Sequence, residues 1–413
     1  MADFLSISSE GRSSVNIAQE EKSNSFAKSL EKNGRLPPVS LMVKPLDTNR
    51  EQFFLDRFLT YEFQSSILIP VDTFQFTFVA PDDLRPIPYV MQEGDIIQLR
   101  ADDSPLATGI IDSIPVGTTE QDGEVVEIFG RDLMGQLEDN NAVNLDSTPM
   151  WGENIAIDEV IRRLAANTRI NPDVTIQGPD LKPGPFATEP NETKLQTLQR
   201  YLEPLNALAW MNSLGRIVVG KPDMKQGVSG KIFNIKSQRS SNTLDIKVIR
   251  QTTKIANIIV PIWAGQENVQ NRIGIEQALL NARENPTRLR KLGHRVIKTV
   301  VVSAPNGDGS QGLDDVRRLE AAGQNVLQAY AKRDLARANV NEMIVQAMMP
   351  GHFNEFGQPY RFDTTYKIEY EKGAVDEVMY LYECKYMMDE RQGPRTLLSF
   401  CPLGSIVADV EAP

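Results

Sequence analysis

Alternating hydrophobic and polar residues predict β-strands in the first third of the chain. In residues 72–80, DTFQFTFVA, Phe74, Phe76 and Phe78 alternate with polar residues, so one face of that strand is expected to be buried. Five further short segments are rich in β-branched and aromatic residues and are bounded by turn residues. These segments are residues 39–43, 60–67, 95–101, 107–114 and 123–130. Short strands at this spacing indicate a β-barrel-like module over residues 38–143.

A helical period of about 3.6 residues replaces the alternation after residue 143. Hydrophobic residues fall on one helical face within residues 154–167 and again within 191–206. Residues 207–220, ALAWMNSLGRIVVG, contain a turn between two strand-like runs and predict a β-hairpin. We therefore expect a small α+β domain over residues 144–222.

The β pattern returns near residue 230 and predicts a second β-barrel-like module over residues 223–405. A hydrophobic seam with a spacing of three or four residues predicts a long helix at 313–337 inside this module, after a Gly-, Ser- and Asp-rich loop at 304–312. The predicted fold class is α+β and mainly β, with two β-barrel-like modules flanking a small α+β domain. The predicted strands of the second module are residues 231–235, 244–252, 254–265, 294–303, 342–349, 365–371, 377–388 and 395–403.

Composition supports a globular protein of several domains. The 413 residues exceed the roughly 250–300 at which one core stops growing, and 41% are hydrophobic and 24% charged. Residues 1–37 are polar and predict a flexible arm, and residues 406–413 form a tail. Apolar runs fall short of the ~20 residues that span a membrane, and the N-terminus lacks the pattern of a secretory signal. We expect assembly in a cytoplasm and no membrane insertion.

Charge and rare residues narrow the chemistry. The net charge of −11 argues against ordinary DNA or RNA binding, since Lys and Arg must neutralise phosphates. Cys384 and Cys401 lie on neighbouring predicted strands, and we expect two reduced, buried thiols. Together with His294 and His352 they offer little material for a zinc site.

The stretch GDGSQG, residues 307–312, matches a dinucleotide-binding pattern between a strand and a helix. The residues SAPN separate the strand from the first glycine, and Asp308, Asp314 and Asp315 would repel a pyrophosphate. A calcium loop starting at residue 306 would need a glutamate at its twelfth position, which is Arg317. We expect a flexible loop.

Acidic residues elsewhere are compatible with two further enzyme classes. Glu383 and Lys385 match half of a metal-dependent nuclease site, with Asp363 or Asp376 upstream. They also alternate with Tyr382, Cys384 and Tyr386, as the wet face of a half-buried strand does. A glycosidase needs two carboxylates, but the doublets at 82–83, 102–103 and 389–390 lie in polar, turn-like surroundings. No catalytic, cofactor-binding or metal-binding residue and no cofactor is therefore assigned.

Residues 125–142, VVEIFGRDLMGQLEDNNA, raise a sharper question: Arg131 and Asp132 form either a catalytic dyad or a structural corner. The corner is favoured. Gly130 would end the strand because the backbone needs a conformation that other residues resist. Asp132 would cap the helical turn of Leu133–Leu137, and Arg131 would bridge to a carboxylate or to carbonyls. Asp132→Ala is expected to lower stability without removing any turnover.

The order of several segments resembles the baseplate hub proteins of contractile phage tails, the family of the bacteriophage Mu hub. FLTYEFQSSILIPVDTFQFTF resembles the opening strands of that family, and EGDIIQLRADDSPLATGIIDSI resembles its segment of Gly-Asp, strand, turn, Thr-Gly and Ile-Asp. VVEIFGRDLMGQLEDNNA resembles its Gly-Arg-Asp motif. The segments 191–222 and 362–403 are similar to its helix-hairpin unit and its C-terminal strands. The resemblance covers most of residues 38–405.

The resemblance implies a structural protein without enzymatic activity. It implies a homotrimer whose six β modules join a six-fold tail tube protein to a three-fold central spike protein, with other baseplate proteins around it in the virion. DNA would pass through a central channel without specific binding, because part of the excess negative charge would repel phosphate. The alternatives are the hub of a tailocin or of a secretion-system spike, and a tail-associated peptidoglycan hydrolase.

Overall fold

The computed structural model confirms a mainly β chain with few helices. It describes residues 38–47, 49–79, 91–119, 123–142, 151–177, 184–188, 191–202, 207–251, 258–263, 283–284, 297–302, 340 and 342–406. The predicted arm 1–37, loop 304–312, helix 313–337 and most of the tail lie outside these residues.

The first β module is defined here as the eight strands that precede the first described helix. They are β1 (Val39–Lys44), β2 (Phe53–Leu55), β3 (Thr60–Ser66), β4 (Thr73–Val79), β5 (Ile96–Ala101), β6 (Ser104–Ser113), β7 (Val116–Thr119) and β8 (Gly123–Arg131). The alternation within β4 is confirmed, since Phe74, Phe76 and Phe78 are all buried. β2 and β7 are short strands that the sequence pattern did not indicate.

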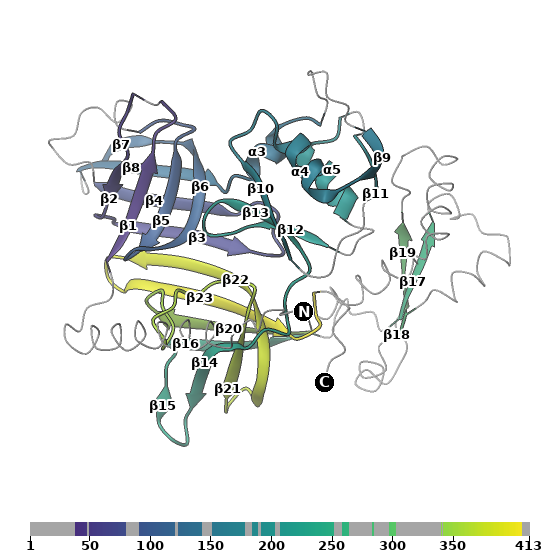
Figure 1. Cartoon of the computed structure of the whole chain (residues 1–413). Coiled ribbons are helices and arrows are strands. Elements are labelled where there is room, and N and C mark those ends of the chain that lie inside the picture. Colours follow the sequence, from purple (N-terminus) through teal and green to yellow (C-terminus); the bar gives the residue numbers. More distant parts are fainter. Residues whose placement is uncertain are drawn as a thin grey trace, which may run out of the picture.

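An α+β unit follows, and it lies beside the first β module in Figure 1. Its elements are α3 (Gly135–Asp139), β9 (Trp151–Ile155), α4 (Ile157–Ala165), β10 (Asn171–Gln177), β11 (Gly184–Ala187), α5 (Lys194–Leu202), β12 (Leu208–Met211) and β13 (Arg216–Gly220). The two predicted helices and the β12–β13 hairpin are confirmed. Leu133, Met134 and Leu137 pack into the core of this unit with α4 and α5.

The remaining strands form two groups. The second β module is defined as β14 (Val228–Ile235), β15 (Ser240–Ser241), β16 (Asp245–Arg250), β20 (Met343–Pro350), β21 (Thr364–Tyr370), β22 (Val375–Asp389) and β23 (Gly393–Pro402). A separate sheet contains β17 (Ile258–Trp263), β18 (Arg283–Glu284) and β19 (Ile297–Val302).

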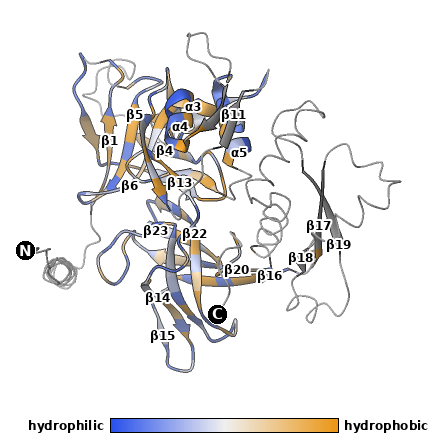
Figure 2. Cartoon of the chain, turned by 45° about the vertical axis from the view of Figure 1, so that its right-hand side comes forward, coloured by the Kyte–Doolittle hydropathy of each residue, from blue (hydrophilic) through white to orange (hydrophobic). Residues whose placement is uncertain are grey.

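The two β modules are hydrogen-bonded to each other along β3 and β22. The sheet contains 15 strands, and its main path is β15-β14-β21-β22-β3-β4-β8-β6-β5-β1-β2. The described strands of the two β modules therefore form one open sheet, and no closed barrel is found among them. In Figure 2 hydrophobic and hydrophilic residues interchange along these strands, as expected for half-buried surfaces. One continuous hydrophobic core extends from Leu41 in β1 to Phe400 in β23. The predicted domain limits remain predictions.

Candidate functional site

Gly130 is required by a close approach and not by its backbone angles. β8 runs through Gly130 to Arg131, so the prediction that the strand ends at the glycine is wrong. Gly130 is absent from the residues with positive φ, so its conformation is open to other residues. A Cβ there would lie 2.0 Å from the Ile110 carbonyl oxygen and 2.3 Å from the Phe74 ring. Neighbouring β6 and β4 therefore leave no space for a side chain.

Arg131 ties β8 to β6 and α3. Its guanidinium donates to both carboxylate oxygens of Asp112, at 2.7 and 3.1 Å, and to both of Asp139, at 2.9 and 2.7 Å. Glu138 adds a longer ion pair at 3.6 Å. The hydrogen bonds that Arg131 donates to Asp139 and Asp112 raise the pKa of Arg131, so it stays charged. The prediction that Arg131 bridges to carboxylates is confirmed.

Asp132 faces a different environment from its neighbour. Its side chain is buried, whereas that of Arg131 is 26% exposed. Met134 occupies the N-cap of α3 and makes no side-chain cap hydrogen bond there. The backbone N–H groups of Met134 and Gly135 instead bind the Asp132 carboxylate, so Asp132 caps the turn that leads into α3, as predicted. Successive residues of a strand point to opposite faces, and this explains the separation. The side chains of Arg131 and Asp132 therefore have different partners, and each joins β8 to neighbouring elements.

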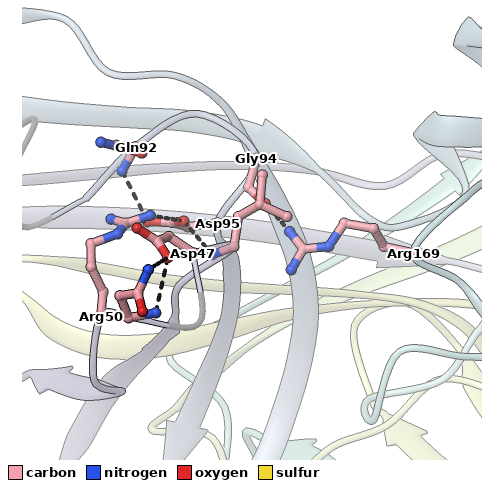
Figure 3. Close-up of polar contacts among 8 residues, drawn as sticks. Asp47, Arg50, Gln92, Gly94, Asp95 and Arg169 are labelled. Carbon is pink, nitrogen blue, oxygen red and sulfur yellow. Dashed lines mark hydrogen bonds and ion pairs between the residues drawn. The ribbon is translucent and has the colours of Figure 1, made fainter.

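Asp95 is the fully buried acidic residue of the first β module. Its carboxylate accepts hydrogen bonds from the backbone N–H groups of Leu46 at 2.7 Å and Gln92 at 2.9 Å, and it forms a bidentate pair with Arg50 at 2.7 and 3.0 Å. Figure 3 shows Asp95 between these partners, with Arg169 reaching the neighbouring Gly94 carbonyl. Asp95 thus fastens two loops of the module, and Arg169 attaches the end of the α4 region beside it.

β22 changes partner at a β-bulge. Its first half, up to Leu381, pairs with β21, and its second half, from Glu383, pairs with β3. The register against β23 shifts between Leu381 and Glu383, leaving Tyr382 as the extra residue. The backbone N–H of Ile67 donates to the Tyr382 carbonyl at 3.0 Å. Before the bulge, odd-numbered residues of β22 such as Met379 face the main core. After the bulge, even-numbered residues face it instead.

The bulge corrects the simple alternation expected for this strand. Glu383 and Lys385 are half-buried, as predicted, and contact Gln64 and Glu62 of β3. Tyr382, however, belongs to a separate cluster with Trp210, Val218 and Met224, while Cys384 and Tyr386 face the main core. The strand is therefore covered on both faces around the bulge, because the α+β unit packs on its second face.

The two upstream nuclease candidates, Asp363 and Asp376, have different structural partners. Asp376 pairs with Lys367 at 2.6 Å. Asp363 accepts hydrogen bonds from the Tyr380 hydroxyl and the Gln177 amide, both at 2.7 Å. Burial raises the pKa of Asp363. These contacts join β22 to the α+β unit, and the Asp363 N–H also donates to the Leu381 carbonyl of β22 at 2.9 Å.

The other sequence candidates lie in structural surroundings or outside the described residues. Cys384 and Cys401 are free and buried, as predicted, and they face different hydrophobic clusters. Burial raises the pKa of both thiols. Asp102 and Asp103 lie exposed in the β5–β6 turn, and Asp389 binds the backbone N–H groups of its own turn. GDGSQG, the 82–83 doublet and His294 lie outside the described residues.

His352 bridges the two β modules, a role that the sequence did not reveal. The Tyr61 hydroxyl of β3 lies 2.6 Å from its Nε2, and Thr396 Oγ1 of β23 lies 2.8 Å from its Nδ1. The Thr396 hydroxyl donates to the Gly351 carbonyl at 2.7 Å, so it must accept from Nδ1–H. Nε2 then accepts from Tyr61. This chain requires a neutral imidazole.

His352 predicts a loss of stability in acid. Burial lowers the pKa of His352 from 6.5 to about 3. A histidine whose pKa is lowered on folding stabilises the fold at pH values above its pKa in the unfolded chain. This contribution is lost as the pH falls from about 6.5 towards 3, and the loss amounts to roughly 3–5 kcal/mol. Chemical denaturation across this range should show the loss. The variant His352→Gln cannot titrate, and its stability relative to wild type should rise as the pH falls; parallel curves would contradict the assignment.

The described residues form neither a cluster of metal ligands nor a membrane-spanning helix. No group of three or more His, Cys, Asp or Glu side chains in that part of the chain is arranged to hold a metal ion. No described helix is long and apolar enough to cross a membrane.

Solved structures of tail proteins share this fold. A tail protein from Neisseria meningitidis MC58 matches with a TM-score of 0.67 at 20% identity, over 89% of this chain and 98% of that chain. The 43 kDa tail protein of prophage MuSo2 from Shewanella oneidensis matches with a TM-score of 0.65 at 12% identity, over 88% and 98%. The E. coli c3393 protein, a component of the type VI secretion system, matches with a TM-score of 0.51 at 9% identity, over 86% and 76%.

Sequence comparisons add no closer relation. No protein-family model matches the chain, and no curated protein matches it. The likeness to the tail proteins is therefore one of fold, and it extends over nearly the whole length of two of them. The chain has the fold of these tail proteins.

Proposed function

We propose that this chain is a structural hub of a phage-type contractile tail baseplate. The observation that carries the proposal is the fold match to two tail proteins over 98% of their lengths. The corner at Gly130–Asp132 supports it, since Arg131 there binds Asp112 of β6 and Asp139 of α3 and so links three elements. A protein that transmits force between partners needs such cross-links between its parts.

The hub would act as a homotrimer in the virion tail, assembled in the host cytoplasm. Three copies would place six β modules around an axis, and this number matches a six-fold tail tube protein on one side and a three-fold spike protein on the other. Other baseplate proteins would bind around the rim. The net charge of −11 per chain would disfavour binding of DNA that passes along the axis.

The proposed trimer can be tested on the purified protein. The purified full chain should form a particle of about three times the 46.2 kDa chain mass by light scattering. Negative-stain electron microscopy of that particle should show a three-fold ring with a central hole. A compact monomer that clears peptidoglycan in a zymogram would instead support a tail-associated hydrolase.

The likeness to the E. coli secretion-system component favours a second candidate, the hub of a related injection machine. Both candidates have the same trimeric geometry, so the particle alone does not separate them. Co-purification of the chain with the spike protein encoded in the same gene neighbourhood would separate the two candidates. A phage hub and a secretion-system hub would retain different partners in that experiment.

A further inference from the structure

Two buried carboxyl groups lie opposite each other at the end of β4 and β8. The register of these antiparallel strands pairs Thr73 with Arg131, so the next rung places Asp72 opposite Asp132. The Asp132 N–H donates to the Asp72 carbonyl at 2.9 Å, which confirms that rung. Side chains of directly opposite residues lie on the same face, with Cβ atoms about 5 Å apart. Asp72 is 5% exposed and Asp132 is 2% exposed, so water screens neither carboxyl group.

The hydrogen bonds around the pair leave one oxygen unsatisfied. The Ser66 N–H donates to Asp72 Oδ1 at 2.9 Å. The backbone N–H groups of Asp72, Met134 and Gly135 bind the Asp132 carboxylate and act to lower its pKa. Its Oδ1 is nevertheless buried and has no hydrogen-bond partner among the described residues. A buried carboxylate oxygen without a donor is costly, and two like charges across a rung repel. A proton held between the two groups removes one charge and supplies the missing donor.

Neighbouring charges do not replace that proton. Arg131 attracts Asp132, but its guanidinium is bound to Asp112 and Asp139 on the exposed side of the corner. Glu383 of β22 adds a further repulsion to Asp72. The remaining groups that act on Asp72 are the hydroxyl of Ser65 and the backbone of Ser66, which are neutral, and Cys384 nearby is a neutral buried thiol.

We propose that Asp72 and Asp132 form a single-proton site that holds the ends of β3, β4 and β8 together, and that loss of the shared proton loosens this joint. The site is next to the bulge where β22 changes partner, because Ser66 both binds Asp72 and lies beside the Tyr382 carbonyl. Its opening would weaken the seam between the two β modules. The inference does not depend on the proposed assembly.

The direction of the pH dependence follows from burial. Burial raises the pKa of Asp132 from 3.8 to about 7, and burial together with Asp132 raises that of Asp72. A carboxyl group whose pKa is raised on folding contributes its full stabilisation at pH values below its pKa in the unfolded chain. This contribution is lost as the pH rises through its pKa in the folded protein. The joint is therefore tightest in mild acid, and the relevant window is about pH 4 to 7. His352 acts in the opposite direction, so variants are needed to separate the two.

Asp132→Asn tests the proposal in the full chain. The amide cannot titrate, so the unfolding equilibrium constant of wild type relative to the variant should rise about tenfold per pH unit between about pH 4 and 7, and about a thousandfold in total. Asp112→Asn makes the same chemical change on the exposed side of the corner, and its difference from wild type should stay nearly constant. A wild type and an Asp132→Asn variant with parallel curves would overturn the proposal.

Infrared spectroscopy of the wild type provides a measurement that needs no stable variant. A carbonyl band of a protonated carboxylic acid should be present near pH 6 and disappear by about pH 9. Amide hydrogen exchange at Ser66 and Asp132, corrected for the intrinsic rate, should accelerate over the same range. Absence of the band near pH 6 would also overturn the proposal. Should Asp132→Asn fail to fold, Asp72→Asn replaces it with the same expected curve.

Discussion

Gly130→Ala is expected to lower the free energy of unfolding by about 3 kcal/mol or more. The added methyl group would lie 2.0 Å from the Ile110 carbonyl oxygen and 2.3 Å from the Phe74 ring. The carbonyl belongs to the backbone of β6 and cannot rotate away, so β6 and β8 would have to separate. Guanidinium denaturation monitored by circular dichroism would measure the loss, and complete failure to fold would be the extreme form of the same result.

Gly117→Ala is the matched control. Gly117 lies in β7, and a Cβ there would meet nothing within 4 Å. The same substitution should therefore change stability by less than about 0.5 kcal/mol. Equal losses at the two glycines would show that backbone entropy, and not the approach of Phe74 and Ile110, determines the effect.

Asp95→Ala is expected to cost about 3–5 kcal/mol, because it leaves the Arg50 guanidinium without its carboxylate. The side chain of Arg50 is 16% exposed and that of Asp95 is 0% exposed, so water cannot substitute for the lost partner. The backbone N–H groups of Leu46 and Gln92 would also lose their acceptor. The same denaturation measurement applies, and the loops at both groups should become susceptible to proteolysis.

Two variants calibrate this result. Asp95→Asn keeps a single acceptor oxygen without the charge and should lose less stability than the alanine variant. Asp103→Ala removes a fully exposed carboxylate 4.0 Å from Arg100 and should leave the stability nearly unchanged, because water screens this pair. A loss at Asp95 no larger than that at Asp103 would refute the role assigned to the buried pair.

The two sites belong to motifs that the sequence singled out for their resemblance to tail hubs. Gly94–Asp95 opens the first of these stretches, Ile111–Asp112 closes it, and Gly130–Arg131–Asp132 forms the second. The structure brings the two stretches together through the pair of Arg131 with Asp112. Their residues fasten strands and loops to one another.

Several contacts at these joints had no sequence signal that marked them as partners. Asp72 is an acidic residue at the start of a predicted strand, and His352 is a single histidine near the end of another. The Gly-Asp of residues 94–95 was part of a resemblance, and this could have directed attention to Asp95. Only the pairing of β4 with β8 brings Asp72 opposite its partner. Only the pairing of β3 with β22 brings His352 close to the first β module.

Local periodicity by itself determined which faces of the elements are buried. The alternation of Phe74, Phe76 and Phe78, and the helical face of α4, depend on residues two to four positions apart, so the chain need not be folded for the pattern to be read. The mainly β character and the α+β unit between β-rich parts followed from the same patterns. The partial solvent exposure of Glu383 and Lys385 was also predicted correctly.

Only the tertiary structure decided how the parts are joined. The edge pairing of β3 with β22 brings together residues more than 300 positions apart, such as Gln64 and Glu383, and no periodic pattern encodes that choice. The bulge at Tyr382 and the lack of space at Gly130 are likewise set by neighbouring strands. The raised pKa of Asp132 also follows only from the tertiary structure, because burial causes it. The pKa of a carboxyl group depends on the solvent and charges around it, and the order of residues does not specify these surroundings.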